Sequence, residues 1–224
     1  MMSAVPADLL PVVETFVSLQ GESTRAGRLC FFIRFAGCNL RCAYCDTVYA
    51  YDDSGATLRS PAELVRMAHD SGVRLVELTG GEPMLQKALP ALARQLLDAG
   101  LEVLLETNGS ILLDTLPPGV GKIVDVKLPS SGMSDRNEPE NYPLLGPGDE
   151  LKFVTGSRAD FDWALDWINR WRLDRLKIPL VFSPVFGAVD PADLARWLID
   201  SRRNDLRMQI QMHKVIWAPD RRGV

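Results

Sequence analysis

The chain has 224 residues, of which 46% are hydrophobic, and its 29 acidic and 25 basic side chains give a net charge of −4. This composition can bury the core of one domain, expected over residues 1–224. The acidic balance argues against a nucleic-acid partner, and no segment reaches the roughly 20 apolar residues that cross a membrane. Residues 1–8 lack the basic and apolar regions of a secretory leader.

Short apolar segments alternate along the chain with amphipathic ones, which is typical of βα units around a mostly parallel sheet. Ser60 followed by Pro61 predicts a helix start, and Asp190 followed by Pro191 predicts another. Further helices are expected over residues 86–98 and 159–171. Residues 129–148, rich in Gly, Pro and Ser, predict one long loop. Strands are expected over residues 29–35, 75–78, 101–105, 123–127, 151–155, 176–181 and 208–211.

Three of the four cysteines form a C-x3-C-x2-C motif, Cys38, Cys42 and Cys45, in the loop over residues 37–47. A [4Fe–4S] cluster takes four thiolates, so three leave one iron open, whereas structural zinc normally closes its shell. Cys30 offers a fourth thiol for a zinc site, but its apolar neighbours favour core packing. Clustered cysteines indicate a metal site and a reducing cytoplasm rather than a disulfide framework.

Two further features lie at predicted strand ends. Thr79-Gly-Gly-Glu-Pro83 follows a buried strand, and its glycines allow close approach of backbone to a ligand, although such a pair alone is more often a turn. Arg34 shares a strand face with Phe32 and can offer a bidentate fork to a carboxylate, with a surface ion pair as the alternative.

The cysteine motif, with Tyr44 before its last cysteine, resembles the signature of the radical S-adenosylmethionine (SAM) enzymes. The resemblance implies a [4Fe–4S] cluster whose open iron is chelated by SAM, and reductive cleavage of SAM to a 5′-deoxyadenosyl radical. It also implies an α/β fold: a partial, open (β/α)6-type barrel with reduced helices. A complete eight-stranded barrel typically takes about 250 residues.

The segments 16–23 and 32–47 resemble the 7-carboxy-7-deazaguanine synthases, with overlap over about residues 13–128 and echoes at 211–214 and 222–224. Those lyases convert 6-carboxy-5,6,7,8-tetrahydropterin to 7-carboxy-7-deazaguanine on the way to queuosine and related 7-deazapurines. The radical removes the C6 hydrogen, the ring contracts and ammonia leaves. Ser23 departs from the family's usual glycine, which would cost about 1 kcal/mol in a left-handed turn.

The same resemblance implies roles for matching positions. The expected catalytic residues are Arg34, which binds the pterin carboxylate, Thr47, which binds Mg²⁺, and Glu106, which holds SAM or a substrate amine. Without the resemblance, Thr47 would be read as a helix cap and Glu106 equally well as a turn cap. The expected substrate-binding residues are Leu19, Gln20, Gly21, Glu22, Arg34, Thr79 and His213. The expected SAM contacts are Tyr44, Cys45, Asp46, Gly81, Glu82, Asp125, Lys127, Ser130 and Lys152. The expected metal ligands are Cys38, Cys42, Cys45 and Thr47.

The implied partners are a small-molecule pterin, an electron donor such as flavodoxin or ferredoxin, and a second copy in a homodimer. A tryptophan stripe at 163, 167 and 171 would suit that interface, and core packing explains it equally well. A glycyl-radical-enzyme activase acting on a protein partner and a non-enzymatic zinc-binding module are the alternative functions. His69 and the pairs Arg202–Arg203 and Arg221–Arg222 are expected at the solvated surface.

Overall fold

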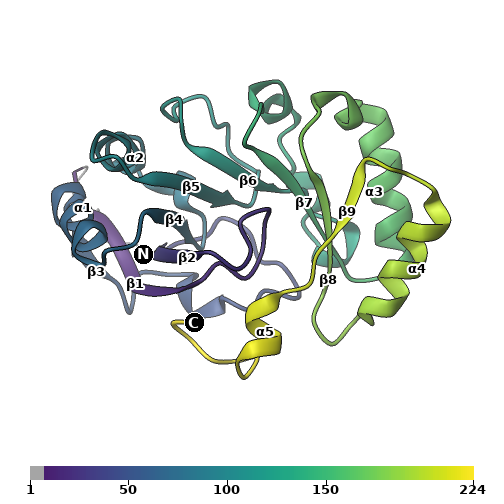
Figure 1. The fold of residues 1–224 in the computed structure, drawn as a ribbon, viewed down its shortest axis with the longest axis horizontal. Coiled ribbons are helices and arrows are strands. Elements are labelled where there is room, and N and C mark those ends of the chain that lie inside the picture. Colours follow the sequence, from purple (N-terminus) through teal and green to yellow (C-terminus); the bar gives the residue numbers. More distant parts are fainter. Residues whose placement is uncertain (1–7) are drawn as a thin grey trace.

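One sheet of nine strands runs through residues 8–224, the part of the chain that this computed structural model describes (Figure 1). The sequence predicts that residues 1–8 are not a secretory leader. Residues 1–7 of that segment lie outside the described residues. The strand order is β3-β1-β2-β4-β5-β6-β7-β8-β9. The strands are β1 (Leu10–Leu19), β2 (Leu29–Phe35), β3 (Thr57–Arg59), β4 (Leu75–Gly80), β5 (Glu102–Thr107), β6 (Gly121–Asp125), β7 (Glu150–Thr155), β8 (Leu180–Pro184) and β9 (Leu206–Met208).

Seven strands pair in parallel, in the order β2-β4-β5-β6-β7-β8-β9. The strands β1 and β3 extend the sheet beyond β2 in antiparallel pairing. The sheet curves without closing, because β3 and β9 remain its two edges (Figure 1). The expected partial, open barrel is therefore confirmed.

Five helices accompany the sheet within residues 8–224: α1 (Pro61–Asp70), α2 (Leu89–Asp98), α3 (Arg158–Trp171), α4 (Pro191–Ser201) and α5 (Met212–Ile216). The two predicted helix starts are confirmed. Ser60 accepts a hydrogen bond from Glu63 N–H at 3.2 Å, and Asp190 accepts one from Ala192 N–H at 2.8 Å. The connections β5–β6 and β6–β7 hold no α-helix, so the helices are indeed reduced in number. The long loop contains only three short 3-10 turns.

All seven predicted strands exist, with bounds shifted by a few residues. The largest error is in β8, where residues 173–176 form a 3-10 turn and Lys177 has φ +55°, so the strand begins only at Leu180. The strands β1 and β3 were missed. Pro11 and the half-exposed side chains of β1 weaken its periodic signal, and β3 has only three residues.

The two faces of the sheet differ in composition because side chains alternate along each strand. The outer face, covered by α1 to α4, is apolar, and its fully buried side chains include Phe35, Phe153 and Phe182. The inner face is polar toward the carboxyl ends of the strands, where Arg34 pairs with Thr79 and Asp125 with Lys152. Functional side chains therefore have one face available.

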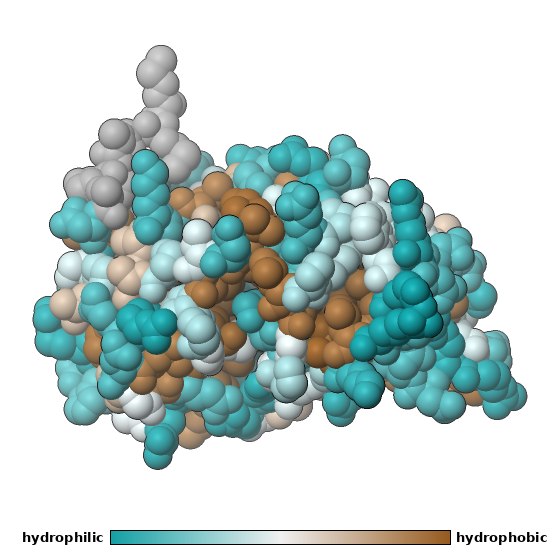
Figure 2. Space-filling model, turned by 90° about the horizontal axis from the view of Figure 1, so that it is seen from above, coloured by the Kyte–Doolittle hydropathy of each residue, from teal (hydrophilic) through white to brown (hydrophobic). Residues whose placement is uncertain are grey.

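The surface of the described residues offers no helix long and apolar enough to cross a membrane. Seen from above, an apolar area is enclosed by hydrophilic side chains (Figure 2). The tryptophan stripe of α3 belongs mainly to the core, because Trp163 and Trp167 are half-buried and pack against it. Their rings stack with centroids 4.7 Å apart. Of the three tryptophans, only Trp171 is exposed. His69 is exposed on α1, as expected.

Candidate active site

A cavity of about 710 Å³ opens at the carboxyl ends of the parallel strands. Its walls come from the β1–β2 turn, the cysteine loop, the ends of β4 to β7, α5 and the C-terminal segment that follows it. The carboxyl edge of a parallel sheet is the usual place for a ligand site in such folds, and the volume suits a ligand of the size of a cofactor.

The three motif cysteines line this cavity from one short loop. A hydrogen bond from Gly37 N–H to the Ala50 carbonyl, at 2.8 Å, closes the base of that loop. Cys30 is fully buried at the opposite end of β2, packs with Phe32 and Leu75, and lies outside the cavity. Within residues 8–224, no group of three Cys, His, Asp or Glu side chains has the spacing of a bound metal. The donor set nevertheless fits a cluster with three protein thiolates and one open iron, and it does not fit a four-thiolate zinc site.

The paired glycines after β4 are required by backbone contacts. Gly80 has φ +145°, and a Cβ there would collide with the backbone of Phe35. A Cβ at Gly81 would collide with the backbone of Gly37, at the base of the cysteine loop. The glycines therefore bring the end of β4 against the cysteine loop, and Gly81 also lines the cavity.

Two of the expected SAM contacts lie outside the cavity. The Glu82 carboxylate is fully buried and accepts hydrogen bonds from Met84 N–H, Thr107 Oγ1 and Asn108 N–H at 2.7 to 2.9 Å. Burial raises the pKa of Glu82 to about 7, against the opposing effect of those hydrogen bonds. Ser130 is exposed, and its backbone N–H donates to Asp160 at 2.9 Å. Both residues stabilise the local chain rather than face a ligand.

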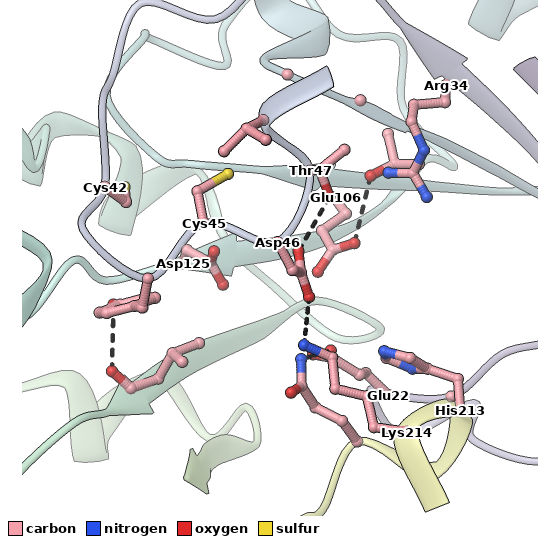
Figure 3. Close-up of a pocket in the computed structure, with 18 of the residues that line it drawn as sticks. Glu22, Arg34, Cys42, Cys45, Asp46, Thr47, Glu106, Asp125, His213 and Lys214 are labelled. Carbon is pink, nitrogen blue, oxygen red and sulfur yellow. Dashed lines mark hydrogen bonds and ion pairs between the residues drawn. The ribbon is translucent and has the colours of Figure 1, made fainter. Parts of the chain in front are cut away.

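A buried charge network on the inner face lines the cavity, and Figure 3 labels three of its carboxylates, Glu22, Glu106 and Asp125. The Lys152 ammonium contacts the Glu106 carboxylate, lies 2.9 Å from Glu22 Oε2 and lies 3.3 Å from Asp125 Oδ1. Lys127 pairs with the other oxygen of Asp125 at 2.5 Å. The side chain of Lys152 is only 6% exposed, so these carboxylates surround a cation that is nearly removed from water.

The charge network fixes its own protonation states. Burial would lower the pKa of Lys152, but Asp125, Glu106 and Glu22 outweigh it and hold that pKa well above the usual value. Burial would likewise raise the pKa of Glu22 and Asp125, yet the neighbouring ammonium groups lower both. The lysine and these two carboxylates are therefore charged at neutral pH.

Arg34 projects from β2 toward the same cavity (Figure 3). Its Nε donates to Glu14 Oε1 at 2.8 Å, and the Tyr49 hydroxyl donates to the same oxygen at 2.9 Å. The side chain is 17% exposed, so the pair is not the solvated surface ion pair that was the alternative. With Nε held by Glu14, the two terminal nitrogens can form a fork toward a carboxylate.

Asp46 and Thr47 follow the last cysteine, and Asp46 faces Lys214 on helix α5 (Figure 3). Thr47 Oγ1 donates to Asp46 Oδ1 at 3.0 Å, and Lys214 Nζ lies 2.6 Å from Asp46 Oδ2. Thr47 occupies the N-cap of the 3-10 turn Val48–Ala50, but its side chain makes no capping hydrogen bond. The capping explanation for Thr47 is therefore wrong, and its hydroxyl lines the cavity.

The β1–β2 turn closes another side of the cavity. The Gln20 side chain, 4% exposed, donates to Glu77 on β4 and accepts from Glu22 N–H at 2.9 Å. Gly21 packs so closely against His213 that a Cβ would collide with the imidazole. Ser23 has φ +64°, the strained conformation, and its hydroxyl accepts from Arg25 N–H at 3.0 Å.

The cavity brings together most of the residues expected from the sequence, from segments far apart in the chain. They are Leu19, Gln20, Gly21, Glu22, Arg34, Cys38, Cys42, Tyr44, Cys45, Asp46, Thr47, Thr79, Gly81, Glu106, Asp125, Lys127, Lys152 and His213.

Sequence reasoning missed several cavity residues. Glu77 carried a signal, since it is a lone carboxylate in the apolar run of β4. Lys214 and Tyr49 carried none, because their role depends on contacts with distant segments. Arg222 is exposed, as expected of a solvated end, but it also lines the cavity. Its guanidinium carbon lies 3.8 Å from the centroid of the Tyr49 ring.

Comparison with known proteins gives concordant results. The model of the Radical SAM superfamily matches residues 32–126. The 7-carboxy-7-deazaguanine synthase of Clostridium acetobutylicum is 42% identical over 95% of this chain and 98% of its own, and that of Koribacter versatilis is 38% identical over 96% and 100%. The crystal structure of QueE from Escherichia coli superimposes with a TM-score of 0.77 at 24% identity, over 92% of this chain and 95% of that one.

Proposed function

The chain belongs to the 7-carboxy-7-deazaguanine synthase family of radical SAM enzymes, and from that premise we propose how its cavity holds SAM, a pterin and Mg²⁺. It is a carbon–nitrogen lyase that converts 6-carboxy-5,6,7,8-tetrahydropterin to 7-carboxy-7-deazaguanine with release of ammonia, in the biosynthesis of queuosine-type 7-deazapurines. Neither the glycyl-radical-enzyme activase nor the zinc-binding module is favoured. One observation supports the assignment of residues: the three-cysteine loop and the Lys152 charge network face the same cavity.

The cysteine loop and the adjacent strand ends form the proposed cofactor side. Cys38, Cys42 and Cys45 would hold a [4Fe–4S] cluster, which together with SAM would supply the 5′-deoxyadenosyl radical. Tyr44 is held toward this side because its hydroxyl donates to the Val154 carbonyl at 3.3 Å. The SAM contacts that we retain are Tyr44, Cys45, Asp46, Gly81, Asp125 and Lys127. The Lys152 ammonium is surrounded by the carboxylates of Glu22, Glu106 and Asp125. We therefore propose that Lys152 orients these carboxylates instead of contacting SAM.

The inner face and the β1–β2 turn form the proposed pterin side. Arg34 presents its terminal nitrogens to the substrate carboxylate. Glu106, whose Oε2 accepts from Thr79 Oγ1 at 3.3 Å, is placed to accept hydrogen bonds from a substrate amine. The Leu19–Glu22 turn and His213 close the site. Holding the C6 hydrogen near the cofactor and excluding water are the contributions of these residues.

We assign Thr47 to Mg²⁺, which its hydroxyl would help to hold beside the substrate. Magnesium takes oxygen ligands and usually keeps several waters, so one hydroxyl from the protein is compatible with it. The Thr47 hydroxyl is not used for capping and lies beside the Asp46 carboxylate. The acidic neighbour supports a cation at this position.

The remaining proposals concern partners and location. Residues 1–224 form a single radical SAM domain that acts as a homodimer, for which the exposed apolar side chains offer a surface. An electron donor such as flavodoxin or ferredoxin supplies the reducing electron. A cluster held by thiolates requires reducing conditions, so we place the protein in the cytoplasm.

The test is an anaerobic assay of the reconstituted protein with SAM, Mg²⁺, a reductant and 6-carboxy-5,6,7,8-tetrahydropterin. We expect both 5′-deoxyadenosine and 7-carboxy-7-deazaguanine. Cleavage of SAM without the deazaguanine would contradict the substrate assignment, and no cleavage by protein with an assembled cluster would contradict the radical chemistry.

The magnesium assignment has its own test in the same assay. Thr47→Ser keeps the hydroxyl and should respond to added Mg²⁺ as the wild type does, whereas Thr47→Val keeps the shape and should lose that response. An equal response in both variants would contradict the assignment.

A further inference from the structure

Glu77 is a buried carboxyl group on the inner face for which the proposed reaction has no role. It lies at the middle of β4, is 1% exposed, and its strand neighbours in register are Phe32 and Leu104. An unpaired carboxylate in such surroundings is strongly disfavoured, so its hydrogen bonds decide its charge.

The two hydrogen-bonding neighbours of Glu77 differ in kind. On one side Gln20 donates its amide N–H to Glu77 Oε2. On the other side the Glu106 carboxyl group lies within reach of a hydrogen bond, and its proximity raises the pKa of Glu77. Two carboxylates can share a hydrogen bond only if one of them carries a proton.

The charged groups around Glu77 determine which carboxyl group holds that proton. The titratable groups near it are Glu22 from the turn, Glu106 from β5, Lys152 from β7 and Cys30 from β2. Lys152 contacts both Glu22 and Glu106 directly. Burial and the charge of Glu106 raise the pKa of Glu77 well above its usual value. Glu106 is already paired with the Lys152 ammonium, whereas Glu77 accepts from the neutral Gln20 amide, so the shared proton is more stable on Glu77.

We propose that Glu77 is a positioning residue for the pterin: as a neutral carboxylic acid it donates to Glu106, accepts from Gln20 and so orients both side chains toward the substrate. The proposal rests on the function given above. Because Gln20 also accepts from Glu22 N–H at 2.9 Å, its amide is fixed at both ends and Glu77 sets the orientation of the turn.

Two substitutions separate this role from simple packing. Glu77→Gln keeps the pattern, since its amide N–H can donate to Glu106 and its carbonyl can accept from Gln20. Glu77→Leu keeps the volume and leaves the Gln20 amide without its acceptor. Glu150 on β7 is the matched control: it is also a buried inner-face carboxyl, accepts from Thr24 N–H at 3.0 Å, and lies outside the cavity.

The experiment is steady-state kinetics of the reconstituted variants, with cluster content and thermal unfolding measured on each. We expect the KM for the pterin to rise about 10- to 100-fold in Glu77→Leu and to stay within about 3-fold in Glu77→Gln and Glu150→Gln. In the wild type that KM should also rise once the pH is high enough to remove the proton from Glu77, and in Glu77→Gln it should not. A wild-type KM in folded Glu77→Leu, or equal damage in both Glu77 variants, overturns the proposal.

Infrared spectroscopy supplies a readout that does not depend on turnover. Protein with ¹³C-labelled glutamate should show the carbonyl stretch of a protonated carboxylic acid that disappears in Glu77→Gln. If the wild type formed no deazaguanine, the proposed function would fail, and this band would still decide the protonation of Glu77. Its absence overturns the proposal.

Discussion

Neighbouring residues on β7 lie in opposite environments. Lys152 faces inward and contacts three carboxylates, whereas Phe153 faces outward, is fully buried and stacks on Phe182 at 4.8 Å. The same alternation separates Glu77 from Leu78 on β4. A parallel sheet buried on both faces usually consists of continuous apolar runs, so charged residues within such runs mark the face that carries chemistry.

The comparison separates stability from function. The outer face contributes the free energy of folding through apolar burial. The inner face holds buried charges, which stabilise a fold weakly and are damaging when one partner is removed. Substitutions on the outer face should therefore change stability alone, whereas substitutions of inner-face residues that line the cavity should also change activity.

The largest effect is expected for Lys152→Met, which leaves Glu22, Glu106 and Asp125 without their shared cation. Stability should fall by about 3–5 kcal/mol, and deazaguanine formation should be abolished. Denaturant unfolding of the apoprotein and the anaerobic assay measure the two effects. As a control, Lys122→Met removes a partner of Asp149 outside the cavity, at 3.1 Å, and should leave activity per folded molecule unchanged.

The outer-face counterpart is Phe153→Ala. Loss of this fully buried ring should lower the free energy of unfolding by about 3–5 kcal/mol. Activity per folded molecule should be retained at a temperature where the variant is folded. A specific loss of activity with an intact fold would mean that the two faces are not independent.

A smaller effect is expected for Arg34→Lys, which keeps the charge but loses the planar fork. The KM for the pterin should rise about 10-fold because bidentate binding is lost. The control is Arg28→Lys, since Arg28 forms a bidentate pair with Glu102, at 2.9 and 2.7 Å, far from the cavity. Equal KM values for the two variants would remove Arg34 from the substrate site.

Glu82 gives a dependence on pH. Its folded-state pKa of about 7 lies above the ordinary value of 4.5, so the folded state binds more protons between these two values. Raising the pH through this window should therefore lower the free energy of unfolding of the wild-type apoprotein relative to Glu82→Gln. If the difference in the free energy of unfolding between the wild type and Glu82→Gln stayed constant from pH 4.5 to 7, the hydrogen bonds to Glu82 would cancel the effect of its burial on the pKa.

The smallest effect is expected for Ser23→Gly. Relief of the left-handed conformation is worth about 1 kcal/mol, and loss of the hydrogen bond from Arg25 N–H opposes it. The net gain in the free energy of unfolding should be below about 1 kcal/mol, with unchanged activity. Marked destabilisation would show that the serine hydroxyl matters more than the strain.

The strands, the helix starts and the cysteine loop could be predicted because their signals are local: apolar periodicity, capping residues and motif spacing. The burial of Cys30 followed from its apolar neighbours in the same way. The antiparallel strand β1 could not be predicted, since most of its side chains are partly exposed and its pairing with β2 and β3 depends on distant segments.

The charge network shows the limit of sequence reasoning. The sequence predicts Lys152 as a SAM contact, but its position among Glu22, Glu106 and Asp125 depends on contacts with segments distant in the chain, up to 130 residues away. Glu82 belonged to a matching motif, and only the packing of β4 on β5 shows that its carboxylate turns away from the cavity. A motif identifies the residue type that is needed, and long-range packing decides which way it faces.

The most direct test of the central claim uses pterin substrate with deuterium at C6. If the inner face holds the pterin beside the cofactor at the cysteine loop, deuterium should appear in 5′-deoxyadenosine while 7-carboxy-7-deazaguanine forms. Mass spectrometry of the recovered 5′-deoxyadenosine measures the transfer. Unlabelled 5′-deoxyadenosine from a reaction that forms the deazaguanine would contradict this arrangement.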